Sequence, residues 1–339
     1  MSDINIRSLA KELNLSIGTV SKALRNSFEI SDETKRKVFD LAKKHNYIPN
    51  PYASSLRRKK SNTIGVVIPE VADSFFSHAI KGIELVAQQK GYHVLIYLTY
   101  ESLLKEEAIM KDFTSGRVDG VLMSISSETS KSVHIHELQS KGIPLVFFDR
   151  VCEEMQTAKI TTDDFESGYK ATKHLIDCGC KNIVLLSISN SLSISNKRLH
   201  GYKKALADHS LPFSSSQVIH CGNDDKENYA LIKKVLSEPG SPDGLIATVE
   251  KLITPVYEAV QDLQLAVPQQ LKIIGFSNLP SATILHPSLT TITQPAFEMG
   301  EAAASVLFNA LAKNISQLKN ETIVLPSLLV SRMSTEAKQ

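Results

Sequence analysis

The sequence predicts an α/β protein with a small helical head and a larger two-lobed body. Three observations support this: basic charge concentrated in the first 60 residues, three short amphipathic segments there, and alternating apolar and amphipathic segments after residue 61. Residues 1–60 contain 13 Lys and Arg against 6 Asp and Glu, whereas the whole chain has a net charge of only +2. This asymmetry favours a polyanion as the partner of the head, although a solvated basic face would have the same composition.

Length and composition exclude several classes of protein. At 339 residues, 42% apolar and 22% charged, the chain is typical of a soluble globular protein with two or three domains. No apolar run approaches the roughly 18 residues of a membrane helix, and the N-terminus lacks the features of a secretory signal. Four cysteines in so long a chain do not indicate a disulfide framework. We therefore expect a cytoplasmic, reduced protein.

Three short helices are expected in the head, and each begins at a good N-cap. Asn5 precedes a helical apolar pattern, Ser16 precedes the segment Ile17–Leu24, and Ser31 precedes a third amphipathic segment. Two short helices joined by a tight turn and braced by a third make a helix-turn-helix. A generic three-helix bundle is the alternative.

The second helix would present small, hydroxyl and basic side chains outward, where an ordinary surface favours Glu and Lys. These residues are Ile17, Gly18, Ser21, Lys22 and Arg25. Such a face is what a reader of the DNA major groove needs. We therefore expect the head to bind DNA.

The linker after the head combines a short helical segment with strong basic charge. Tyr52–Arg58 would give barely two turns, too few to hold a helix alone in water, so it would form only against a partner. Leu56 is the large apolar residue beside Arg57 and three further basic residues. An apolar wedge among basic residues fits insertion between base steps in a minor groove. A flexible basic linker with an incidental leucine is the alternative.

Several motifs together resemble the lactose-repressor (LacI/GalR) family across nearly the whole chain. They are Ile6–Asn26, Ser31-Asp-Glu-Thr34, Tyr47-Ile-Pro-Asn50, Ala53-Ser-Ser-Leu56, Ile64-Gly-Val-Val-Ile-Pro69 and Leu329–Thr335. The resemblance implies a dimeric regulator, repressing by default, whose recognition helices read the two half-sites of a palindromic operator. It also implies paired hinge helices and a periplasmic-binding-protein-like body that binds a small-molecule effector, a sugar or a derivative.

The resemblance assigns DNA contacts by position. The implied contact residues are Ser16, Ile17, Gly18, Thr19, Ser21, Lys22, Asn26, Asn50, Ala53, Leu56 and Arg57. Lys22 stands where the family usually has Arg, and Lys lacks the bidentate fork of Arg, so base discrimination there is expected to be looser.

The body is expected to contain two similar doubly wound parallel sheets. The first series has strands at Thr63–Ile68, His93–Leu98, Gly120–Ser124 and Pro144–Phe148, with helices at 75–90 and 103–115. The second series has strands near 182–187, 217–220, 243–247 and 271–276, with helices near 166–177, 196–209, 226–237 and 252–264. A strand near 290–293 and a helix at 296–312 are expected to return to the first lobe.

These patterns define the expected domains. They are a helix-turn-helix domain at 1–49, a hinge helix and basic linker at 50–61, and a body at 62–339. The first lobe would comprise about 62–162 and 293–322, and the second about 163–292 and 323–335.

Ligands of such sheets bind at the carboxyl ends of strands, which here means the cleft between the lobes. The residues expected at the effector are Phe75, Phe76, Asp149, Arg198 and Ser277. The phenylalanines would pack on a ring of the effector or belong to the core. Asp149 and Arg198 would bind hydroxyls or a carboxylate, or would form ion pairs that bridge the lobes.

Two positions depart from the family. Val249-Glu250 stands where the family often has Asn-Asp, and Ser277 stands where it often has Asp. A serine cannot replace the charge-assisted pairing of a carboxylate with two sugar hydroxyls. We therefore hypothesise that the effector is not a simple neutral hexose bound in the usual way, an idea that tight glucose or galactose binding in calorimetry would refute.

No catalytic, cofactor or metal motif is expected to carry chemistry. Glycine-rich nucleotide loops and a nucleophile elbow are absent from the sequence. Cys178 and Cys180 with His174 offer too few ligands for a metal and are interpreted as buried structural thiols, and His134 and His136 as surface residues. We therefore expect a protein that is not an enzyme and needs no cofactor.

The main alternative is a small-molecule (sugar) receptor without a gene-regulatory role. The body alone would fit that alternative, but the basic helix-turn-helix argues against it. A Rossmann-type enzyme is a third, weaker option. The sequence leaves open whether the effector promotes DNA binding or release, and whether the protein represses or activates. A dimer is favoured over a tetramer because the tail after residue 333 is too short for a tetramerising helix.

Overall fold

The computed structural model describes residues 5–47 and 60–336, in two compact units that divide after Ser61. The expected hinge residues Asn50, Ala53, Leu56 and Arg57 lie outside the described residues. In the part that is described, no helix is long and apolar enough to cross a membrane.

The head contains the three expected helices, α1 (Ile6–Glu12), α2 (Ile17–Leu24) and α3 (Asp32–Lys44). Their N-caps are the three predicted residues, and in each case the side-chain oxygen accepts a hydrogen bond from a backbone N–H of the first turn. The helices enclose a small apolar core of Leu9, Ala10, Val20, Ala23, Val38 and Ala42. The predicted helix-turn-helix is confirmed.

The first lobe of the body is built on a six-stranded sheet in the order β11-β5-β4-β3-β1-β2. Its strands are β1 (Thr63–Ile68), β2 (His93–Leu98), β3 (Gly120–Met123), β4 (Leu145–Phe148), β5 (Ala158–Thr162) and β11 (Thr322–Leu325). Its helices are α5 (Ser74–Gln89), α6 (Leu103–Phe113), α7 (Val133–Ser140) and α12 (Ala296–Ala312). The described strands pair in parallel, as expected for buried apolar strands joined by helices.

The second lobe repeats this design with a sheet in the order β12-β10-β9-β8-β6-β7. Its strands are β6 (Ile183–Ser187), β7 (Val218–His220), β8 (Gly244–Ala247), β9 (Lys272–Phe276), β10 (Thr290–Thr293) and β12 (Leu328–Val330). Its helices are α8 (Asp164–Asp177), α9 (Ser193–Asp208), α10 (Asp225–Ser237) and α11 (Ile253–Asp262). The edge strand β12 pairs antiparallel with β10.

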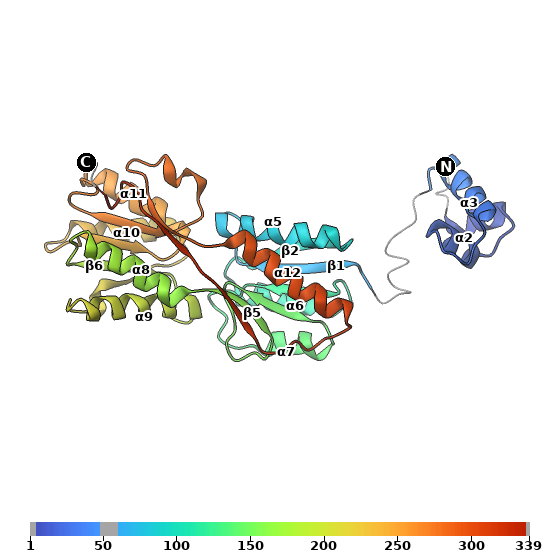
Figure 1. Ribbon diagram of the computed structural model, residues 1–339, viewed down its shortest axis with the longest axis horizontal. Helices are drawn as coiled ribbons and strands as arrows, with labels where there is room; N and C mark the ends of the chain where they lie inside the picture. Colours follow the sequence, from blue (N-terminus) through green and yellow to red (C-terminus); the bar gives the residue numbers. More distant parts are fainter. Residues whose placement is uncertain (1–4, 48–59, 337–339) are drawn as a thin grey trace. The chain divides into compact units, whose positions relative to one another are not determined.

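Two strands correct the expected lobe boundaries. The strand near 290–293 was expected to return to the first lobe, but β10 pairs in parallel with β9 and so belongs to the second sheet, in agreement with the expected second-lobe boundary at residue 292. β11 was expected to belong largely to the second lobe, but it pairs with β5 in the first sheet. Strand pairing between distant segments decides both positions, and local periodicity carries no information about it. The described chain therefore crosses between the lobes after β5, after β10 and after β11 (Figure 1).

Each lobe contains one pair of helices packed at close range on glycines. In the first lobe α5 lies against α12, as Figure 1 shows, and a Cβ on Gly300 would lie 2.0 Å from the carbonyl oxygen of Ala79. In the second lobe α8 lies against α9, and a Cβ on Gly201 would lie 2.0 Å from the carbonyl oxygen of Phe165. Both separations are far below van der Waals contact, so only glycine fits at these crossings. The same glycine-mediated helix contact occurs in both lobes, which supports the interpretation that the lobes are two versions of one structural unit.

The variant Gly300→Ala should therefore destabilise the body. The added methyl must push α12 away from α5, and overpacking of this kind costs about 1–3 kcal/mol. Denaturant unfolding of the full chain measures this loss. Gly222→Ala is the matched control, since a Cβ there meets no atom within 4 Å, and it should change stability by less than about 0.5 kcal/mol. Equal stability of the two variants would contradict the packing described.

Candidate functional site

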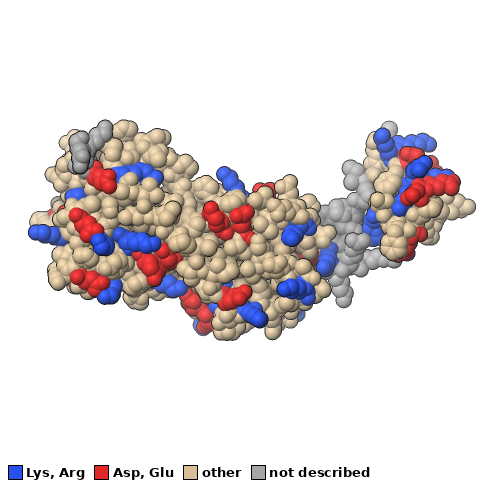
Figure 2. All heavy atoms as spheres, viewed as in Figure 1, with Lys and Arg blue, Asp and Glu red and all other residues tan. Residues whose placement is uncertain are grey.

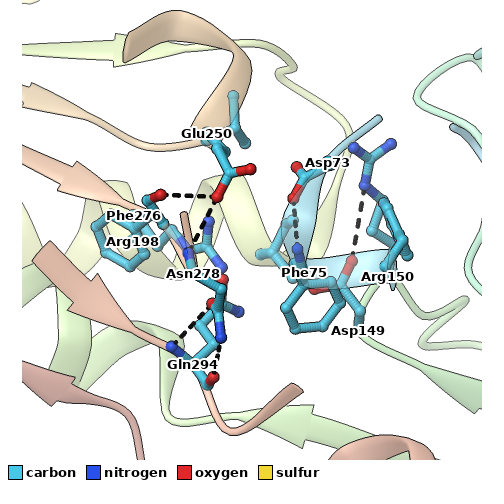
Figure 3. Close-up of a pocket in the computed structure, with 13 residues that line it drawn as sticks. Asp73, Phe75, Asp149, Arg150, Arg198, Glu250, Phe276, Asn278 and Gln294 are labelled. Atoms are coloured by element: carbon cyan, nitrogen blue, oxygen red, sulfur yellow. Dashed lines mark hydrogen bonds and ion pairs between the residues drawn. The ribbon is translucent and has the colours of Figure 1, made fainter. Parts of the chain in front are cut away.

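A closed cleft between the lobes gathers the predicted effector residues. Its lining is Asp73, Phe75, Phe76, Asp149, Arg150, Ile194, Arg198, Val249, Glu250, Phe276, Ser277, Asn278 and Gln294. Figure 3 shows these side chains approaching one another from the ends of strands in both lobes. The free space at the centre is only about 20 Å³, which is room for about one water molecule.

The two phenylalanines of the first lobe take part in both the core and the cleft. Phe75 and Phe76 follow the N-cap Asp73 at the start of α5 and are 5% and 2% exposed. Their rings meet edge to face with centroids 5.3 Å apart, and both rings also line the cleft. The two interpretations left open by the sequence are therefore compatible, because the same rings close the core and form the wall of the cleft.

Asp149 and Arg150 lie side by side directly after β4, and both are buried. The Nη1 atom of Arg150 donates to both carboxylate oxygens of Glu101 at 2.7 and 2.9 Å, whereas its Nε lies 3.9 Å from Asp149 and has no hydrogen-bond partner. The carboxylate of Asp149 accepts only a long hydrogen bond, 3.4 Å, from Ser124. Burial raises the pKa of Asp149 to about 6, and the nearby guanidinium groups oppose that shift.

Arg198 is held entirely by the second lobe. Its Nε and Nη2 atoms donate to Asp164 at 2.8 and 2.7 Å, and Nη1 donates to the carbonyl oxygen of Thr248. The guanidinium also lies over the ring of Phe276, 4.2 Å from its centroid. Ion pairs bridging the lobes through Asp149 or Arg198 were one expectation, and this expectation is wrong for both, because the cation beside Asp149 is Arg150 of its own lobe.

Glu250, which departs from the family pattern, is a lining residue that was not predicted as part of the site. In the structure its carboxylate accepts hydrogen bonds from the hydroxyl of Ser277 at 2.7 Å and the backbone N–H of Asn278 at 3.0 Å (Figure 3). It also accepts from the backbone N–H of Ser74 at 2.8 Å and the hydroxyl of Ser74 at 2.5 Å. The predicted site residue Ser277 therefore contacts a carboxylate of the chain itself.

Other residues of the lining were not predicted as effector contacts, among them Asp73, Asn278 and Gln294, although Asp73 and Asn278 belong to strand-end segments expected at the cleft. Asp73 caps α5, accepting from the N–H of Phe75 at 2.8 Å. Asn278 donates to the carbonyl oxygen of Gln294 at 2.6 Å, which ties the loop after β9 to the crossing segment after β10. The sequence signal for Asp73 was present, since an Asp before an amphipathic segment is a typical N-cap. No local sequence pattern predicts that Gln294 lies in this cleft.

The outward face of α2 is placed as expected. Ile17 is 45% exposed, and beside Gly18 there is open space apart from the hydroxyl of Ser16. The hydroxyls of Ser16 and Thr19 lie 2.8 Å apart, so these two side chains hold the start of the helix. Lys22 forms an ion pair with Glu29 in the turn that follows α2, a partner that sequence reasoning did not identify.

The structure corrects two predictions, one about His134 and one about Cys178. His134 was expected at the surface, but it is buried and hydrogen-bonds through Nε2 to Glu106 at 2.8 Å, because α7 turns it toward that fully buried carboxylate. Cys180 is buried as expected, and burial raises its pKa to about 12. Cys178 is only partly buried, 3.7 Å from His174, which itself hydrogen-bonds to Thr335.

Family models match both units of the chain. Residues 5–50 match the model for bacterial regulatory proteins of the lacI family, and residues 61–327 match the model for periplasmic binding proteins and the sugar-binding domain of the LacI family. The chain belongs to the LacI family. The match over the head disfavours the alternative of a receptor that consists of the body alone.

Similar proteins of this family span the whole chain. Catabolite control protein A of Priestia megaterium is 28% identical over 335 residues, covering 98% of this chain and 100% of the relative. The lac repressor dimer bound to operator and an anti-inducer has a TM-score of 0.84 at 21% identity, over 99% and 100% of the two chains. The complex of the regulator CelR with cellobiose has a TM-score of 0.73 at 21% identity, over 98% and 99%. Because each of these two structures is only 21% identical to this chain, the structural matches establish the fold of the chain and nothing further.

The cleft carboxylates predict a pH dependence of stability. Burial, reinforced by the nearby Glu250 carboxylate, raises the pKa of Asp73 to about 7, against about 4 in the unfolded chain. The folded state therefore binds this proton more tightly, so the stabilisation is complete below about pH 4 and is lost as pH rises through 7.

Asp73→Asn should remove this loss, because Asn still caps α5 but does not ionise. Relative to the native chain, the variant should gain stability on the order of 1–4 kcal/mol between pH 5 and pH 8. Denaturant unfolding at several pH values measures the difference. Parallel stability curves for the two proteins would show that Asp73 ionises normally.

Proposed function

We propose that this LacI family member is a repressor that binds a palindromic operator as a homodimer and responds to a small-molecule effector. The observation that carries the proposal is the outward face of α2, where a capped helix presents Ile17, Gly18 and Lys22 in a head that matches the family model. A helix of this kind supplies side chains to base edges in the major groove. A receptor without a regulatory role would have no use for it.

The chemistry of α2 fits base reading better than simple attraction to phosphate. The ammonium of Lys22 is already paired with Glu29, so the pair carries no net charge toward the DNA backbone. The ammonium retains donors for an acceptor such as a guanine O6 or N7. Hydroxyl groups of Thr19 and Ser21 stand nearby on the same helix and suit phosphate or base contacts. We propose these residues, with Ser16, Ile17, Gly18 and Asn26, as the DNA-reading set.

A homodimer is supported by an exposed apolar surface on the first lobe. β2 lies at the edge of its sheet, and this edge is accompanied by large exposed apolar side chains. They are Val71, Leu85, Leu95, Ile96, Tyr100 and Leu104. Open sheet edges and clustered apolar side chains favour association with another chain. Figure 2 shows acidic and basic side chains interspersed over the visible face of the body.

The effector is proposed to bind in the cleft between the lobes, at Phe75, Phe76, Asp149, Arg198 and Ser277. Aromatic walls beside carboxylate and guanidinium groups are suited to a small polar ring compound. The complex of CelR with cellobiose supports a sugar or a related metabolite as the class. We infer a cytoplasmic regulator that is not an enzyme, since its proposed task is to couple two binding events.

Selection of bound sites from a random duplex DNA library tests the proposal. The full-length protein should enrich a palindrome with a flexible central step at near-physiological salt, because a symmetric dimer reads two half-sites. Metabolite pools added to the selection allow for a required corepressor. Failure to enrich any sequence under both conditions would contradict the regulator function.

Lys22→Ala should weaken binding to the selected operator by about 1–3 kcal/mol and relax the preference at one base pair. The salt dependence of binding should change little, because a contact to a base edge neutralises no phosphate. Affinity measurements at several salt concentrations check this. Lys43→Ala in the last turn of α3 is the control and should leave the base preference intact. A uniform loss across sequences would make Lys22 a phosphate contact.

A further inference from the structure

Glu250 connects the two lobes through a single carboxylate. It belongs to the second lobe, between β8 and α11, and its oxygens accept from Ser277 and Asn278 of the same lobe. The other two hydrogen bonds come from Ser74, the first residue of α5 in the first lobe. Both lobes therefore place their donors on one acidic group. Four donors satisfy this carboxylate in the closed cleft.

Other polar contacts also join the two lobes. The hydroxyl of Ser191 donates to the carbonyl oxygen of Ser127 at 3.1 Å, and Lys197 pairs with Glu153 at 2.8 Å. The ion pair is formed by exposed side chains, and exposed pairs stabilise a structure by about 1 kcal/mol or less. Among these contacts in the described structure, only that of Glu250 lies between residues that line the cavity. It is thus well placed to hold the lobes together at their centre.

The closed cleft is too small for an effector. About 20 Å³ is free at the centre, and a metabolite the size of a sugar needs several times that volume. An effector that occupies the cleft must therefore separate Glu250 from Ser74 or take over its hydrogen bonds.

The charges of the cleft determine which groups can do so. Asp73, Asp149 and Glu250 line it together with Arg150 and Arg198. The guanidinium groups of these arginines are paired with Glu101 and Asp164, although the Nε of Arg150 has no hydrogen-bond partner in the described structure. A neighbouring hollow of about 450 Å³ shares Asp73 and Glu250. In the described structure this hollow is also lined by Glu70, Glu101 and Asp225, with Lys251 as its basic residue. An acidic ligand is repelled here, whereas hydroxyl or ammonium groups find acceptors.

We propose that Glu250 determines both the class of effector and the response of the cleft: its carboxylate bridges the lobes in the closed cleft, which has no room for an effector, and the effector displaces Ser74 by offering donors of its own. The inference rests on the proposed function, because it concerns the same cleft. The cleft then selects ligands that bear hydroxyl or ammonium groups and rejects ligands that bear carboxylates. Glu250 also restores to the cleft the carboxylate that Ser277 lacks, since the hydroxyl of Ser277 donates to it.

Hydrogen–deuterium exchange of the full-length protein without ligand tests the bridge. Glu250→Ala should accelerate exchange at the amides of Ser74 and Asn278, one in each lobe, by about tenfold or more, as expected if closure loses on the order of 1.4 kcal/mol. Glu258→Ala is the matched control, since this glutamate is exposed on α11. Unchanged exchange at Ser74 in Glu250→Ala would overturn the proposal.

Sodium acetate tests whether the same carboxylate excludes acidic ligands. In Glu250→Ala, acetate should restore part of the protection at both amides, while sodium chloride at equal ionic strength should not. In the native protein acetate should have no effect, because Glu250 already holds the donors. Acetate protection in the native cleft, or none in the variant, would contradict the assignment. Operator selection by the native protein remains independent of this result, so a failed bridge leaves the regulator function standing.

Discussion

The closed cleft depends on the neutralisation of buried carboxylates at the surface where the two lobes meet. Lobe closure removes these groups from water, which is costly unless each finds donors or a cation. Glu101 is paired with Arg150 in the first lobe and Asp164 with Arg198 in the second. Among the carboxylates that line the cleft in the described structure, Glu250 takes donors from both lobes. The arginine–carboxylate pairs lie within one lobe each, so the lobes can separate without breaking those pairs.

The chain path explains how separation of the lobes could reach the head. The lobes are joined by the three crossings after β5, β10 and β11, so they can rotate about these segments without breaking either sheet. The proposed hinge segment is too short to form a helix alone. Formation of the hinge helix would then depend on the distance between the two hinge segments, which the paired first lobes of a dimer would set. An effector shifts such an equilibrium only by its differential affinity for the two states.

Local signals in the sequence were sufficient for most of the fold, and long-range contacts account for the errors. The three N-caps of the head and the bounds of β1, β2 and α12 followed from caps and apolar periodicity. The sheet membership of β10 and β11 did not, because pairing joins segments distant in sequence. The same limit applies to the cleft. Phe75 and Ser277 could be placed at strand ends, but the contact of Glu250 with Ser74 spans 176 positions and leaves no local pattern.

The central claim is that the state of the cleft controls the head, and operator affinity tests it most directly. The dissociation constant of the full-length protein for its selected operator should be measured without effector, for the native chain and for Glu250→Ala, at one salt concentration. Opening of the cleft in Glu250→Ala should change this dissociation constant by about fivefold or more, the usual range of coupling between sites. Glu258→Ala should leave the affinity unchanged. Equal affinities for native protein and Glu250→Ala, with the cleft demonstrably opened, would contradict the account.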